Sequence, residues 1–134
     1  MADVDDIADA LLARCATLAV GSPALTIAMP EVSFTPPASG KYLDVAIFYN
    51  RPAWEGVASG RLDQGLLQVT VVWPKGQGVV KPMEAAQTVM AHFAKGLTLQ
   101  SGTANVKITA APYATSPLID EFDVRVPVTI GWKA

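Results

Sequence analysis

Apolar residues recur along this chain with two spacings, about 3.6 residues in some segments and two in others. These spacings predict its helices and strands. From Val4 to Ala19 the apolar residues recur on one side of a 3.6-residue repeat, as in an amphipathic helix. A second such stripe follows Pro82, which the first turn of a helix tolerates, and it ends at Gly96. Its members are Met83, Ala86, Val89, Met90, Phe93 and Ala94. We therefore expect two helices, each with one apolar face to bury.

The first predicted helix begins in an acidic segment. Asp3 can cap its N-terminus, and Gly21 with Pro23 marks its end. Carboxylates near the first turns interact favourably with the helix dipole, and three stand there: Asp5, Asp6 and Asp9. A charged contact surface is the alternative interpretation of this cluster.

Five further segments have the alternation or the β-branched composition that is typical of strands. By residue number they are 25–29, 42–49, 64–73, 103–110 and 122–132. Apolar residues occupy both faces of the second segment, so we expect both faces to be covered. The third segment is expected at the centre of the sheet. Pro127 cannot donate a ladder hydrogen bond, so the last strand is expected at an edge or bulged there.

The order of these elements predicts an α+β fold. We expect a single mixed, mostly antiparallel sheet of about five strands, with two helices packed mainly on one face. The length of 134 residues is that of one domain, so residues 1–134 are expected to share one core.

The segment from Asn50 to Asp63 has no clear period and is predicted to be a long connection. Long loops without structure are uncommon in compact domains and are usually functional. Trp and Arg are the residue types that most often anchor protein interfaces. The candidate interface residues are therefore Arg51, Trp54, Glu55 and Arg61. The alternative is that the Trp54 side chain folds back onto its own core.

Composition narrows the classes of function. The chain is 51% hydrophobic and 16% charged, which describes a folded globular protein. Its net charge of -2 and sequence pI of about 5.2 argue against tight nucleic-acid binding, which needs clustered Lys and Arg. An acidic N-terminus is unlike a secretory signal, and no apolar run approaches the roughly twenty residues of a membrane span. A cytosolic origin without membrane contact is expected.

Candidate chemistry is sparse. His92 is the one histidine and falls beside core positions of the second helix, so we expect a surface or boundary side chain. Cys15 is the one cysteine, which excludes an internal disulfide and a cysteine-cluster zinc site. We expect it in the core as a small apolar residue. Asp44 is a single acid within a strand and has no evident catalytic partner.

Three short motifs have ordinary structural interpretations. The sequence Gly76-Gln77-Gly78 is accounted for by a strand-to-helix turn. The pair Gly40-Lys41 lacks the first glycine and the Ser or Thr of a phosphate-binding loop. The acids around Glu121 point to opposite faces of an extended segment and have no histidine or cysteine partner. We therefore predict no catalytic residue, no cofactor and no metal.

Several segments, in this order and spacing, resemble the lambda-type tail terminator proteins of siphophages. The distinctive stretch is Gly65-Leu66-Leu67-Gln68-Val69-Thr70-Val71-Val72-Trp73-Pro74-Lys75-Gly76-Gln77-Gly78. It is preceded by Tyr42-Leu43-Asp44-Val45 and followed by His92-Phe93-Ala94-Lys95-Gly96 and Arg125-Val126-Pro127-Val128-Thr129-Ile130. The resemblance covers most of the chain from Tyr42.

The resemblance implies a structural virion protein rather than an enzyme. Its expected form is a homo-hexameric ring at the head-proximal end of a siphovirus tail, assembled in the host cytoplasm. Its expected partners are further copies of itself, the tail tube protein and the head-tail connector or stopper protein, with DNA passing through unbound. The alternatives are another neck, head-tail joining or tube component, or a small α+β enzyme or ligand-binding module.

Overall fold

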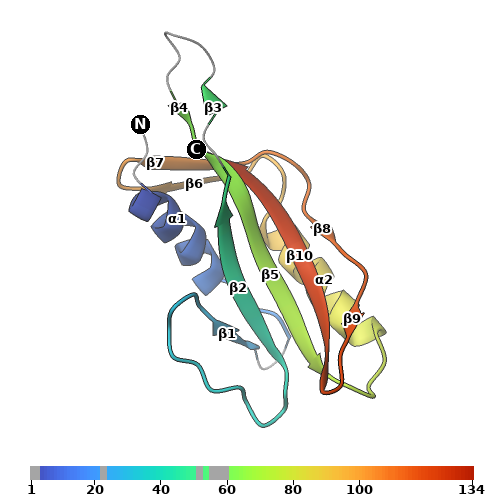
Figure 1. Cartoon of the computed structure of the whole chain (residues 1–134). Helices are drawn as coiled ribbons and strands as arrows, with labels where there is room; N and C mark the ends of the chain where they lie inside the picture. The colour runs from blue at the N-terminus through green and yellow to red at the C-terminus, as the bar shows by residue number, and fades with distance from the viewer. Residues whose placement is uncertain (1–3, 22–23, 51–52, 55–60) are drawn as a thin grey trace.

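The computed structural model describes residues 4–21, 24–50, 53–54 and 61–134. Its main sheet has eight strands, of which six form a continuous path (Figure 1). In spatial order these are β1 (Thr26–Ala28), β2 (Tyr42–Tyr49), β5 (Gln64–Pro74), β10 (Asp123–Lys133), β7 (Ala104–Ile108) and β6 (Thr98–Ser101). Two short strands, β8 (Tyr113–Ala114) and β9 (Leu118–Ile119), also pair with β10. The α+β class is confirmed, although the sheet has eight strands where about five were expected.

Among the described strands of this sheet, one pairing is parallel, that of β1 with β2, and the others are antiparallel. The centre is the ladder of β2, β5 and β10, in which β5 and β10 pair at eleven positions. The prediction that residues 64–73 form a central strand is therefore confirmed.

One face of the ladder carries the core. Successive strand residues point to opposite faces, and the core-facing set of each strand is apolar. On β5 and β10 the buried members of this face include Leu67, Val69, Val71, Val126 and Val128. They form one cluster with buried side chains of α1 (Val4–Ala16) and α2 (Val80–His92). Both helices pack mainly on this face, as the two amphipathic stripes predicted.

The other face of the ladder is only partly covered, which corrects the expectation for β2. Leu43 and Val45 on the core face are 0% and 3% exposed, whereas Phe48 on the other face is 50% exposed. A run of apolar residues suggested two covered faces, but an aromatic side chain at a strand end lies at the surface here. We call this second face the open face.

The expectation that Pro127 marks an edge or a bulge is also wrong. The strand β10 lies between β5 and the row of β9, β8 and β7, and its register with β5 is unbroken. The missing N–H is tolerated because pairing on the second side is discontinuous, between Val124–Arg125 with β9 and Val128–Thr129 with β8. The Pro127 carbonyl still accepts a hydrogen bond from the Thr115 N–H at 3.0 Å.

The ends of the helices differ slightly from the expected ones. Helix α1 ends at Ala16 rather than Ala19, because the Thr17 hydroxyl and the Leu18 N–H bond back to carbonyls of the last turn. Leu18 is nevertheless buried. Helix α2 ends at His92, and the chain leaves it through Gly96 at φ 91°, a left-handed conformation that favours glycine.

Candidate functional site

The predicted interface segment is not a structureless connection throughout. Strands β3 (Ala53–Trp54) and β4 (Arg61–Leu62) pair antiparallel, and Trp54 is the register partner of Arg61. Figure 1 places this pair beyond the end of the main sheet. Sequence reasoning missed it because two paired residues are too few for an alternation to register. Two of the four candidate residues are thus paired across two short strands, while Arg51 and Glu55 lie outside the described residues.

His92 is a half-buried residue that joins two helices. Its carbonyl oxygen accepts hydrogen bonds from Arg14 Nε at 3.2 Å and Nη2 at 2.8 Å. Its Nε2 lies 3.1 Å from the Arg14 carbonyl oxygen and 2.8 Å from the Thr17 hydroxyl. Burial of the ring is the main cause that lowers the pKa of His92 below its ordinary value. The position of His92 at the boundary between core and surface was predicted. Its hydrogen bonds join the C-terminal ends of α1 and α2.

Two other candidates for chemistry are engaged structurally. Cys15 is fully buried in α1, and this burial raises the pKa of its thiol to about 12, so a reactive thiolate is disfavoured. Asp44 is a surface residue on the open face, where its carboxylate lies 3.7 Å from Arg125 Nη1. Arg125 also contacts Asp123 at 3.4 Å, so the three side chains form an ion-pair network across β2 and β10.

Within the described ranges, no group of three or more metal-ligating side chains comes together. No helix in that part of the chain is long and apolar enough to cross a membrane. The glycines of the β5–α2 turn, Gly76 and Gly78, have φ of 93° and 80°, as turn glycines do.

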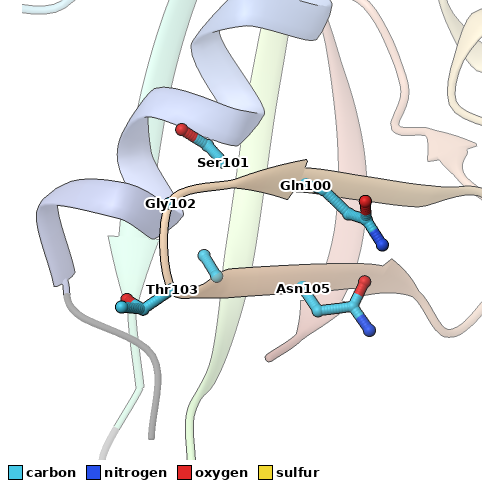
Figure 2. A pocket seen from close by; sticks show the side chains of 6 residues that line it. Gln100, Ser101, Gly102, Thr103 and Asn105 are labelled. Atoms are coloured by element: carbon cyan, nitrogen blue, oxygen red, sulfur yellow. The ribbon is translucent and has the colours of Figure 1, made fainter.

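A polar hollow of about 470 Å³ lies at the turn between β6 and β7 (Figure 2). Its lining consists of Gln100, Ser101, Gly102, Thr103, Ala104 and Asn105. The turn is bound to the first turns of α1, because Thr103 donates to Asp6 from its N–H at 2.9 Å and its hydroxyl at 2.8 Å. These bonds lower the pKa of the Asp6 carboxyl. The Ser101 hydroxyl donates to the Asp9 carboxylate.

These contacts assign a structural role to part of the acidic cluster of α1. Gly102 has φ 52°, which favours glycine, and a Cβ at this position would lie 2.5 Å from the Asp6 carboxylate, so a larger residue would displace that side chain. The carboxylates hold a turn in place, and the hollow beside them is open and built from one hairpin. We assign no catalytic arrangement to it.

Three strongly exposed apolar side chains of the described residues lie together at a hairpin turn. We call this group the tip, and it comprises Leu118, Ile119 and Phe122, which are 59%, 67% and 79% exposed. The turn is closed by a 2.8 Å hydrogen bond from the Asp120 N–H to the Asp123 carbonyl oxygen. Sequence reasoning missed the tip because Phe122 fits the alternation of β10, whose core-facing members continue from Val124.

A second apolar group lies on the open face near the opposite end of the ladder. We call it the patch, and it comprises Phe48 and Leu66, which are 50% and 38% exposed and are register partners on β2 and β5. Gly131 on β10 is paired with Leu66 and leaves space beside it. Because the two side chains are adjacent and exposed, the patch is a candidate for protein contact.

The comparison with protein families decides what kind of protein carries these surfaces. The model of the family described as phage tail terminator protein matches residues 6–132, which is nearly the whole chain. The chain belongs to this family of phage tail terminator proteins. The resemblance found in the sequence is thereby confirmed, and the protein has a structural role in a phage tail.

A solved structure resembles this tail terminator along almost its full length. The two superpose with a TM-score of 0.79 at 28% sequence identity, over 99% of this chain and 96% of the other. Among curated proteins, none matches the chain. The family to which this tail terminator belongs is structural, so its exposed surfaces are of more functional interest than its hollows.

Proposed function

We propose that the chain acts as one domain that forms a homo-hexameric ring on the head-proximal end of a siphovirus tail tube. The ring stops polymerisation of the tube and provides the joining surface for the head connector. The observation that carries this proposal is the family match over residues 6–132. In this proposal the protein has no catalytic role and needs no cofactor.

The properties of the chain are consistent with a ring through which DNA passes. A ring requires two different surfaces on each subunit, since a head-to-tail contact repeats around an axis until it closes. The tip and the patch are two different exposed apolar surfaces on the subunit. The net charge of -2 disfavours strong binding to phosphates, so DNA would move through the ring without specific contacts. Assembly from subunits made in the host cytoplasm is the expected route.

The segment that carries Arg51, Trp54, Glu55 and Arg61 is proposed as a further assembly contact. Its support is the β3–β4 pair, which extends beyond the sheet where it meets no other described strand. Its partner is either the adjacent subunit or the tail tube. Tryptophan and arginine are the side chains that most often dominate the binding energy of such contacts.

Imaging of tails that lack and then regain the protein tests the proposal. Without the chain, tubes should exceed their normal length and fail to join heads, and wild-type protein supplied in trans should restore both. Six copies should then be found at the head-proximal end of each tail. Copies distributed along the tube would indicate a tube component, and copies on the head side only would indicate a different neck protein. A chain that is monomeric at all concentrations and missing from virions would refute the proposal.

A further inference from the structure

The tip and the patch differ in the charges around them. Asp120 and Glu121 are exposed within the tip, between Ile119 and Phe122. Lys75 begins the adjacent turn and offsets one of these two charges. The tip is therefore an apolar surface with an acidic rim.

The patch has a basic border. In the next row of the open face, Lys133 of β10 pairs with Gln64 on one side and with Lys107 on the other. Both lysines are exposed, whereas Asp63, the residue before Gln64, is 7% exposed. The patch thus combines an apolar surface with two exposed lysines, which complements the acidic rim of the tip.

We propose that the tip of one copy docks on the patch of a neighbouring copy of this chain. This inference rests on the proposed ring and deepens it by naming the contact between subunits. Phe122 enters against Phe48 and Leu66, and Glu121 faces Lys133 at the rim. Complementary charges at a rim steer association and fix its register, while the buried apolar anchor supplies most of the affinity.

The two surfaces cannot meet within one molecule. Asp123 is paired with Pro74 and Gly131 with Leu66, so eight residues of β10 separate the tip from the patch. At about 3.4 Å per residue the separation is about 27 Å along a continuous strand. The contact is therefore between copies, and because it joins two different surfaces it propagates head to tail.

The tip is also suited to binding because its turn is already ordered. Besides the hydrogen bond that closes it, the Glu121 N–H donates to Asp120 Oδ1 at 2.6 Å. A side chain presented on a closed turn loses little conformational freedom on association, so more of its contact energy appears as affinity.

A photo-crosslinker at position 122 tests the contact directly. The full chain is prepared with p-benzoylphenylalanine in place of Phe122, irradiated both in solution and in assembled tails, and analysed by mass spectrometry. We expect links to residues 46–50, 64–68 or 130–133, and a mixture of isotope-labelled and unlabelled chains should show that they join two copies. The same group in place of Val32, which is 62% exposed in another loop, should give no links to these segments. Links from position 122 only to a different tail protein would overturn the inference.

Charge reversal gives an independent readout. Glu121→Lys and Lys133→Glu should each weaken self-association about ten-fold, and the double variant should recover to within about three-fold of the wild type. Phe122→Ser should weaken it by at least about ten-fold, while Val32→Ser leaves it unchanged. Because these side chains are exposed, melting temperatures should be unaffected. If Phe122→Ser still forms hexamers on tails, the tip–patch contact is refuted but the proposed ring is not. If the wild-type chain never associates, the proposed ring itself is refuted.

Discussion

Gly65 offers a sharp test of how closely β2, β5 and β10 approach one another. It is paired with Tyr49 of β2 and Trp132 of β10. A Cβ at this position would overlap the Phe48 carbonyl oxygen and lie 2.7 Å from Cζ2 of Trp132. Because Trp132 is 1% exposed and the carbonyl belongs to the backbone, neither neighbour can move away freely. Gly65→Ala should therefore strain the ladder where β5 lies against Phe48 and Trp132.

The magnitude follows from the clash and from the size of the protein. Overpacking typically costs about 1 to 3 kcal/mol, and an overlap with backbone puts this site near about 3 kcal/mol. The entropy of unfolding is about 2.1 cal/mol/K per residue, hence about 280 cal/mol/K for 134 residues. The melting temperature of Gly65→Ala should fall by about 11 °C.

Gly131 is the matched control, since it occupies an adjacent row of the same ladder. A Cβ there would lie 3.9 Å from Thr109 Oγ1, which is an ordinary contact. Gly131→Ala should raise stability by about 0.4 to 1 kcal/mol, because it restricts the unfolded chain. Calorimetry or circular dichroism melts of both variants measure the difference. A Gly65→Ala variant that melts within about 3 °C of the wild type would refute the close approach of Phe48 and Trp132 to Gly65. An equal fall in melting temperature in Gly65→Ala and Gly131→Ala would show that a clash with these neighbours is not the cause.

Three further predictions concern other parts of the chain. Hydrogen bonds from Thr103 lower the pKa of Asp6 in the folded protein below 3.8. The stability that they contribute is therefore present above pH 3.8 and is lost as the pH falls through the lowered pKa. Melts from pH 7 to 2 should show this loss, and Asp6→Asn should make the melting temperature less dependent on pH in this range. Trp54→Ala should cost roughly 2 to 4 kcal/mol of association with little change in monomer melting, and a large fall in melting temperature would instead place this side chain in the core. His92→Gln and Cys15→Ala should leave tail assembly intact in a capping assay, and failure of assembly with normal melting would contradict a purely structural role for either side chain.

Much of the fold follows from periodicity alone. The segment 42–49 coincides with β2, and the alternation from Val124 to Trp132 marks the core face of β10. The apolar stripe of the second helix is confirmed at Ala86, Val89 and Phe93, although Met83 is 39% exposed. These elements were predictable because long amphipathic segments bury one face, which leaves a repeated signal.

The short and peripheral elements were not predictable in this way. The strand β6, Thr98–Ser101, was missed because only Leu99 in it is a large apolar residue. Pro127 indicated an edge because it lacks an N–H donor. Whether that donor is needed depends on which side of the strand is paired, and the pairing is set by the tertiary structure. The tip was missed for a related reason: the sequence shows that Phe122 is apolar but not that the turn carries it past the end of the core.

The position of β10 in the sheet has a consequence for how the protein is made. This strand is the last described element in the sequence. It nevertheless lies between β5 on one side and β7, β8 and β9 on the other. Until it leaves the ribosome, the nascent chain exposes one whole side of β5 and the valines of its core face. Contacts between residues far apart in sequence also form slowly. The sheet therefore closes only after translation of β10, and products truncated before it would present a long open strand edge, which is the kind of surface that aggregates.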